Sequence, residues 1–220
     1  MKRVALVPFK SLSTAKARLA PILSLPERQA LALAMLWDVL STLLAAKGLD
    51  EVALVSSDAK PLKLAEGVGA RTLPEKDSPG ESQSVEEASL QLVKDGADSI
   101  LVIPADVPLV TPAEVEIVIA QDPPAADQPQ VVMVPSRDED GTNAHLRHPP
   151  GVIRSHFGPG SFKKHLLEAE QKGVPVVVLR FPGLALDIDT PEDLKLLAKE
   201  RKPCHAYDVL KERELLPRIL

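Results

Sequence analysis

The chain has 220 residues, 45% of them hydrophobic and 26% charged, which is enough for one compact domain with a buried core. A formal net charge of −5 and an aromatic content of 3% argue against a nucleic-acid-binding surface. The single cysteine, Cys204, excludes a disulfide framework, and we identify no apolar run as a signal peptide or a membrane span. These features predict a cytoplasmic protein without a nucleic-acid or membrane partner.

Short β-branched runs alternate along the chain with longer segments of helical periodicity. We expect strands, in chain order, at 3–7, 51–57, around 71, and at 99–106, 130–136 and 174–181. We expect helices at 24–48, 62–66, 84–96, from 111 onward, and at 161–172 and 190–201. The stretch 137–160, rich in glycine, proline and polar residues, is expected to be irregular.

Several of these helices begin with a recognisable cap. The capping-box pattern, in which a hydroxyl residue is followed three positions later by a glutamate, predicts where a helix starts. It occurs at Ser24 with Glu27, Ser84 with Glu87, and Thr111 with Glu114. Thr190 is placed to cap the last helix, and Gly48 to close the first.

The alternation of apolar strands and helices predicts an α/β fold, with a mostly parallel central sheet and helices on both faces. We expect one domain over residues 1–200 and a C-terminal extension over 201–220, predicted to be helical. In such folds ligands bind beyond the carboxyl ends of the strands. The residues that follow each strand are therefore the candidates for a functional site.

The segment after the first strand, VPFKSLSTAKARLAP, is basic: it carries Lys10, Lys16 and Arg18 within nine positions. It contains no glycine, so the dinucleotide-binding fingerprint and the Walker P-loop are both absent. A basic loop at this edge of the sheet is suited to hold a triphosphate and to neutralise a leaving pyrophosphate. A solvated surface loop is the alternative interpretation.

Three carboxylates follow strands or extended segments. Asp106 ends the apolar run SILVIPAD, while Asp187 and Asp189 lie two positions apart in LALDIDTPEDL. Because residues i and i+2 of an extended segment point to the same side, this pair is able to face one metal ion. Mg²⁺ binds few carboxylates together with substrate phosphates, so a magnesium site is predicted. A turn aspartate and a helix cap are the alternatives for Asp106 and Asp189.

The stretch HFGPGSFKKH, from 156 to 165, combines two glycines and a serine with a predicted helix start. Gly158, Gly160 and Ser161 allow the backbone to approach a ligand, and a helix N-terminus attracts anions. Lys163 and Lys164 are unfavourable in a first helical turn unless an anion is near, so a phosphate cradle is predicted. The histidines lack the spacing of a zinc site.

These motifs together resemble the 2-phospho-L-lactate guanylyltransferase family, the CofC/FbiD enzymes of coenzyme F420 biosynthesis. The resemblance rests on VPFKSLSTAKARLAP, SLPERQALALAMLWDVL, PADVPLV, DGTNAHLRHPP, FGPGSFKKH and LDIDTPEDL, which follow one another from Val7 to about Leu194. It implies a nucleotidyltransferase fold of the glycosyltransferase-A type, with GTP as donor, Mg²⁺ as cofactor and a small phosphorylated carboxylic acid as acceptor.

The resemblance also implies roles for individual residues. Lys10, Lys16 and Arg18 would hold the GTP phosphates, with Lys16, Arg18 and Asp106 as the catalytic set. Asp106, Asp187 and Asp189 would hold magnesium. The phosphate of the acceptor would be bound by Thr142, Asn143, Gly158 and Ser161.

One stretch departs from the family pattern. Where relatives usually carry a GLN-x-A run, this chain has SPGESQSVEEA. We expect Glu81, Ser82, Gln83 and Ser84 to contact the nucleotide base, with the Glu81 carboxylate accepting from guanine N1–H and N2–H₂. The departure leaves the choice of base open.

Two alternatives remain, and the departure motivates the first of them. The first is a nucleotidyltransferase of the same fold that uses another nucleoside triphosphate or acceptor. The second is a non-catalytic nucleotide-sensing module, which we expect to have lost a metal carboxylate or the basic loop. Phospholactate, phosphoenolpyruvate and 3-phosphoglycerate remain open as acceptors, and a homodimer is a possible assembly.

Overall fold

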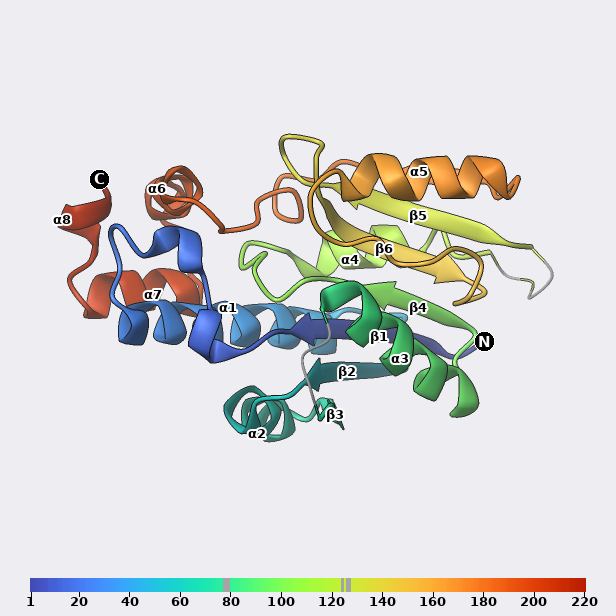
Figure 1. Cartoon of the computed structure of the whole chain (residues 1–220), viewed down its shortest axis with the longest axis horizontal. Coiled ribbons are helices and arrows are strands. Elements are labelled where there is room, and N and C mark those ends of the chain that lie inside the picture. Colours follow the sequence, from blue (N-terminus) through green and yellow to red (C-terminus); the bar gives the residue numbers. More distant parts are fainter. Residues whose placement is uncertain (77–79, 124, 126–127) are drawn as a thin grey trace.

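The computed structural model describes residues 1–76, 80–123, 125 and 128–220. Within them lies one seven-stranded sheet, in the order β3-β2-β1-β4-β6-β5-β7 (Figure 1). The strands are β1 (Arg3–Phe9), β2 (Glu51–Ser56), β3 (Arg71–Pro74), β4 (Ser99–Val102), β5 (Gln130–Pro135), β6 (Thr142–His148) and β7 (Val176–Val178). The sheet is mostly parallel, because only β6 runs antiparallel to its neighbours β4 and β5.

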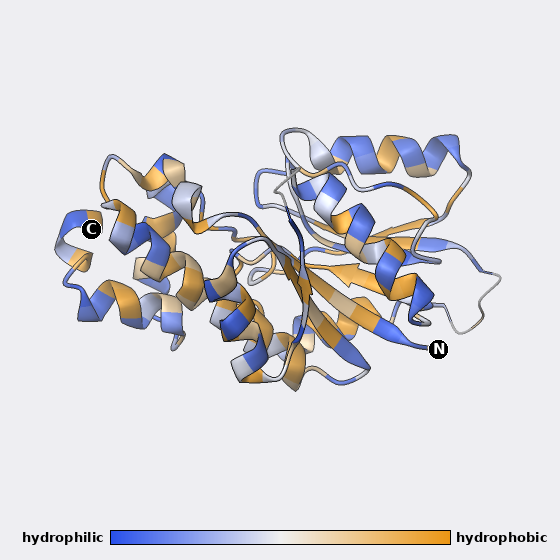
Figure 2. Ribbon diagram, turned by 60° about the horizontal axis from the view of Figure 1, so that its bottom comes forward, coloured by the Kyte–Doolittle hydropathy of each residue, from blue (hydrophilic) through white to orange (hydrophobic). Residues whose placement is uncertain are grey.

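Helices cover both faces of this sheet, as predicted. They are α1 (Leu25–Ala45), α2 (Ala59–Val68), α3 (Glu81–Lys94), α4 (Pro112–Ile119), α5 (Ser161–Gln171), α6 (Pro191–Glu200), α7 (His205–Glu212) and α8 (Leu216–Ile219). Successive side chains of a strand point to opposite faces of the sheet. Val7 and Leu54 therefore pack on the face covered by α1, whereas Leu6 and Val55 pack on the face covered by α3. In Figure 2 the strands form an apolar layer between amphipathic helices.

Helix α1 is the longest element and begins as predicted, with reciprocal bonds between Ser24 and Glu27. We found no membrane-spanning run in the sequence, yet α1 reaches the length and apolarity of such a span, the one helix to do so among the described residues. Half of its most apolar window is buried, and Leu36 and Leu40 lie in the core. It packs in the core against the sheet of the α/β fold. It ends at Ala45, so Gly48 lies in the turn beyond it and does not cap it.

The main difference from the sequence prediction is β6, which lies inside the stretch expected to be irregular. Most of its side chains are polar yet buried, so no apolar run marked it. Arg147 donates to Glu86 and Ser89, and His148 shares a hydrogen bond with Ser99. These partners replace the hydrogen bonds to water that burial removes, which makes a buried polar strand possible.

Helix α3 begins at Glu81 rather than at Ser84, so the predicted capping box of Ser84 with Glu87 is wrong. Gly80 precedes the helix with a positive φ of 113°, a conformation that glycine adopts readily, and Ser84 is buried in the first turns. Strand β4 also ends earlier than expected, at Val102, because the chain turns away before Asp106.

The C-terminal residues form the helices α7 and α8, and they close a second apolar cluster. Leu210 and Ile219 pack there with Leu19 of the basic loop and Ile188 of the aspartate loop. The buried Asp38 of α1 accepts hydrogen bonds from the backbone N–H groups that open α7. The C-terminal segment thus lies against the two loops that carry the candidate site, while the domain boundary near residue 200 stays a prediction.

Candidate active site

The loop after β1 folds into two short 3-10 turns, Leu12–Thr14 and Ala17–Leu19. Two residues outside the loop hold its backbone in place. The Asp58 carboxylate accepts from Leu12 N–H at 2.6 Å, and the Arg28 guanidinium donates to the carbonyl of Ala15 at 2.8 Å. Sequence analysis gave Asp58 no role, although it follows β2 at the same edge of the sheet. The basic loop is therefore anchored rather than free in solvent.

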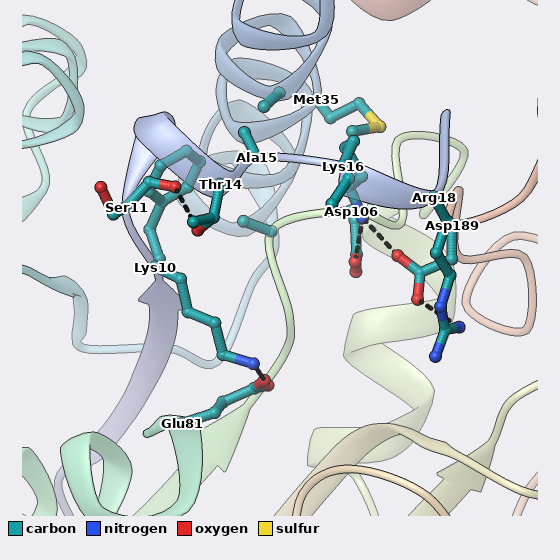
Figure 3. A pocket seen from close by; sticks show the side chains of 14 residues that line it. Lys10, Ser11, Thr14, Ala15, Lys16, Arg18, Met35, Glu81, Asp106 and Asp189 are labelled. Carbon is teal, nitrogen blue, oxygen red and sulfur yellow. Dashed lines mark hydrogen bonds and ion pairs between the residues drawn. The ribbon is translucent and has the colours of Figure 1, made fainter. Parts of the chain in front are cut away.

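This loop forms one wall of a pocket of about 340 Å³ at the carboxyl edge of the sheet (Figure 3). Six of the predicted site residues line it: Lys10, Lys16, Arg18, Glu81, Asp106 and Asp189. They come from the loops after β1 and β4, the start of α3 and the segment before α6. The structure thus brings together residues from distant parts of the chain, such as Lys16 and Asp189, which are 173 positions apart and share a hydrogen bond.

Lys16 occupies the centre of the site. Its Nζ donates to Asp106 Oδ2 at 2.5 Å and to Asp189 Oδ1 at 2.8 Å (Figure 3). Burial by itself lowers the pKa of Lys16, but the two carboxylates raise it well above its ordinary value. Arg18 approaches Asp189 from the solvent side, with Nη1 3.4 Å from Oδ2. The site therefore holds fixed positive charge next to two carboxylates.

The third aspartate, Asp187, is held by β6. Asn143 Nδ2 donates to Asp187 Oδ1 at 3.0 Å. Burial, and then the charge of Asp106, raise the pKa of Asp187 to about 6. The backbone N–H of Ile188, between the two aspartates, donates to the carbonyl of Asp106 at 3.0 Å. This bond places the aspartate loop directly beside Asp106.

The carboxylate oxygens of this site fit magnesium only when a substrate supplies further oxygen ligands. Among the residues that the structure describes, no group of three or more His, Cys, Asp or Glu side chains is placed to share a metal ion. However, Asp106 Oδ1 is buried without a hydrogen-bond partner in the described chain, and the pKa of Asp187 is raised by burial and then by the charge of Asp106. Oxygen ligands of this kind, completed by phosphate oxygens, are what Mg²⁺ prefers.

The residues predicted for the acceptor form a separate, mostly buried group. Ser161 is buried, and its hydroxyl donates to Thr142 Oγ1 at 3.3 Å. His165 accepts from the backbone N–H of His156 at Nε2, so its neutral ring donates from Nδ1 to Thr142 Oγ1. Asn143 alone of the predicted acceptor set contacts an aspartate of the metal group.

The glycines of this segment adopt the conformations that require glycine, with φ of 108° at Gly158 and 70° at Gly160, directly before α5. The start of the helix already has one carboxylate partner. Asp140 accepts from Gly160 N–H through Oδ2 at 3.0 Å and from Phe162 N–H through its carbonyl. Sequence analysis gave Asp140 no role although it begins the DGTNA motif, because the sequence does not show which N–H groups its oxygens meet.

The four residues predicted to contact the base are divided between two places. Glu81 lies in the main pocket, where Lys10 Nζ pairs with its Oε2 at 3.0 Å. Gln83 and Ser84 instead line a second pocket of about 360 Å³ between the ends of β2 and β3 and helix α3. Ser82 is half-buried between them. The carboxylate expected at a guanine edge thus has a lysine as its partner.

A mostly parallel sheet with a basic loop, strand-end aspartates and a pocket at its carboxyl edge defines the nucleotidyltransferase class. Solved structures agree on the fold. A protein described as a nucleotide-diphospho-sugar transferase from Desulfovibrio desulfuricans G20 superposes with a TM-score of 0.78 at 17% identity, covering 100% of this chain and 99% of that one. A cytidylyltransferase from Leptospira borgpetersenii gives 0.62 at 14% identity, covering 98% and 96%.

Sequence relatives narrow the class. The family model described as "Guanylyl transferase CofC like" matches residues 3–215. Phosphoenolpyruvate guanylyltransferase of Sphaerobacter thermophilus is 39% identical, over 90% of this chain and 93% of its own length. The 2-phospho-L-lactate guanylyltransferase of Methanothermobacter thermautotrophicus is 32% identical (96% and 91%), and the 3-phospho-D-glycerate guanylyltransferase of Colwellia psychrerythraea 34% (92% and 94%). The chain belongs to the CofC-like guanylyltransferase family, and the resemblance seen in the sequence is confirmed.

Proposed function

We propose that this enzyme transfers GMP from GTP to a small phosphorylated carboxylic acid and releases pyrophosphate, as a step of coenzyme F420 biosynthesis. The acid is phosphoenolpyruvate, 2-phospho-L-lactate or 3-phosphoglycerate, the three acceptors in the names of its relatives. The observation that carries the proposal is the pocket in which the basic loop faces Asp106 and Asp189. Cations opposite carboxylates provide what a triphosphate and its metal require.

In this proposal the triphosphate of the donor lies along the basic loop. Lys10, Lys16 and Arg18 line the same pocket and supply three positive charges to it. The base extends toward the second pocket, where Gln83 and Ser84 lie. Glu81 lies at the start of α3 and pairs with Lys10. If Lys10 moved to the phosphates, the carboxylate of Glu81 would become free to bind guanine.

The reaction needs little acid–base chemistry. A phosphate oxygen of the acceptor attacks the α-phosphorus of GTP, a new P–O bond forms, and the bond to the bridging oxygen of pyrophosphate breaks. Lys16 and Arg18 stabilise the negative charge that develops on the departing pyrophosphate, and the anchored loop holds the reactants in line. Mg²⁺, held by Asp106, Asp187 and Asp189, would add charge neutralisation at the phosphates.

The acceptor is assigned to the segment around the start of α5. Gly158 and Ser161 line the turn, and Thr142 and Asn143 lie on the adjacent strand. Asn143 contacts Asp187, which places this group next to the proposed metal site. Since Ser161 and Thr142 turn their hydroxyls toward each other, their role is to shape the cradle as well as to contact the ligand.

The proposal is tested by pyrophosphate release, measured with each of the four nucleoside triphosphates against each of the three acids. We expect release with GTP and at least one acid, and no release when either substrate is omitted. Release with ATP, CTP or UTP at an equal or higher kcat/KM would favour the alternative donor. The Glu81–Lys10 ion pair is the specific observation behind that alternative.

The proposal also includes a cytoplasmic location and a homodimer. A cytoplasmic location agrees with the soluble α/β fold and the lone Cys204, which is not in a disulfide. A nucleotide-sensing module is disfavoured, because the chain keeps the basic loop and the three aspartates, of which Asp106 and Asp189 line the same pocket as the loop.

A further inference from the structure

The ammonium group of Lys16 lies between two carboxylates that the proposed function assigns to a metal ion. It is 2.5 Å from Asp106 Oδ2 and 2.8 Å from Asp189 Oδ1, and the side chain is only 11% exposed (Figure 3). Hydrogen bonds between charged groups at these distances are short and strong. The positive charge of Lys16 therefore occupies the space between the two aspartates, and Arg18 pairs with Asp189 from the solvent side.

The backbone holds Lys16 in this position. Lys16 has a φ of 49° and a ψ of 47°, the left-handed conformation that is uncommon for a residue with a Cβ atom. The residues just before it are fixed by Arg28 at Ala15 and by Asp58 at Leu12. Such conformations persist where the surroundings impose them, and they gather at functional sites.

The lysine satisfies only part of the carboxylate cluster. Asp106 Oδ1 is buried and lacks a partner among the described residues, and Asp187 is bonded through one oxygen to a neutral amide. A divalent cation would draw on the same carboxylates as the ammonium group. Two cations cannot share this space at low cost, because like charges at such distances repel strongly.

We infer that Lys16 is an internal counter-ion that keeps divalent metal out of the nucleotide-free site, so that metal enters together with the nucleotide. The polyphosphate offers a new anionic partner to Lys16, whose flexible stem allows the ammonium group to leave the aspartates. Metal and Lys16 therefore exclude each other at Asp106 and Asp189, and nucleotide relieves the exclusion. This inference rests on the magnesium site of the proposed function.

The inference is tested on the nucleotide-free protein by Mn²⁺ titration, with free Mn²⁺ measured by electron paramagnetic resonance. We expect weak binding to the wild type and an affinity raised by about tenfold or more in Lys16→Met, since the competing charge is gone. Lys10→Met is the matched control: it removes a lysine from the same pocket, but one that pairs with Glu81. The affinity of the Lys10→Met variant for Mn²⁺ should differ from that of the wild type by no more than about twofold.

Equal gains in the two variants would mean that only the general charge of the pocket matters, and would overturn the inference. Unchanged or weaker Mn²⁺ binding in Lys16→Met would overturn it as well. To show that the gained ion binds between the aspartates, Asp106→Asn is added to Lys16→Met, and the gain should disappear. A gain that survives Asp106→Asn would also contradict the inference.

A second measurement does not depend on how well a Lys16 variant folds. The melting temperature of the wild type should not respond to millimolar Mg²⁺ alone, but should rise when Mg²⁺ and GTP are added together, by more than with GTP alone. A rise with Mg²⁺ alone would overturn the inference and leave guanylyl transfer untouched. Failure of the proposed function would appear differently, as metal binding without pyrophosphate release.

Discussion

Asn143 Nδ2 donates a hydrogen bond of 3.0 Å to Asp187 Oδ1, and so ties β6 to the aspartate loop. Burial, and then the charge of nearby Asp106, raise the pKa of Asp187 to about 6, although the hydrogen bond from Asn143 acts in the opposite direction. A raised pKa means that the folded state binds the proton more tightly than the unfolded chain. Ionisation of Asp187 therefore lowers the free energy of unfolding. The negative charge that it places in the site favours the binding of a cation.

We expect Asp187→Asn to stabilise the metal-free protein while it abolishes turnover. In the wild type the cost of ionisation grows as pH rises from about 4 to about 6 and is complete above it. The variant should thus be more stable by up to about 3 kcal/mol at pH 8, with little gain at pH 4. Urea denaturation at the two pH values measures this. A loss of stability at pH 8 would contradict the assigned pKa.

Ser161→Ala tests the cradle at the start of α5. Because Ser161 bonds to Thr142 beside the Asn143–Asp187 contact, its loss should disturb the acceptor more than the donor. We expect the KM of the acid to rise by roughly tenfold while the KM of GTP changes little. Initial rates at varied acid and varied GTP measure both constants. An effect confined to GTP would reverse the assignment of the two subsites.

Much of this arrangement was predictable, because strand-end residues in an α/β fold converge at one edge. The basic loop and the aspartates Asp106 and Asp189 meet in one pocket, as their positions after strands suggested. Strand β6 was not predictable, since its polar side chains are paired in the interior with Glu86, Ser89 and Ser99, and sequence periodicity does not report such partners. The Glu81–Lys10 pair was missed for the same reason.

The buried histidine pair should make the fold sensitive to acid. The His145 ring stacks on His165 at 4.3 Å, and its two nitrogens lack partners within the described chain. Burial, followed by nearby positive charges, lowers the pKa of His145 well below its ordinary value and that of His165 to about 3. Both rings are therefore neutral in the folded state, whereas in the unfolded chain they bind protons below about pH 6.5.

Stability should accordingly fall as pH drops below about 6.5, by up to about 1.4 kcal/mol per pH unit for each ring. His145→Leu removes one of the two titrating groups, and its packing cost does not depend on pH. The slope of unfolding free energy between pH 6 and pH 4, from urea denaturation, should therefore be shallower in the variant. An identical slope would show that His145 is already accessible to protons in the folded state.

The C-terminal helices should contribute to stability through the cluster behind the site. Leu210 of α7 is fully buried among Leu19 and Ile188, which neighbour Arg18 and the aspartates. We expect Leu210→Ala to cost about 2–4 kcal/mol, since it leaves a cavity. Leu90→Ala, at a side chain that is 64% exposed, should cost no more than about 0.5 kcal/mol. Similar losses in chemical denaturation would contradict the packing of α7.

The central claim is that GMP moves from GTP to a phosphorylated acid in the pocket around Asp106. The direct measurement is mass spectrometry of the GDP-linked acid formed from GTP and each of the three acids, by the wild type and by Asp106→Asn in parallel. The wild type should form the conjugate with at least one acid, and Asp106→Asn, while still folded, should form less than about a hundredth as much. Conjugate formation at the wild-type rate by Asp106→Asn, or none by the wild type with any acid, would contradict this account.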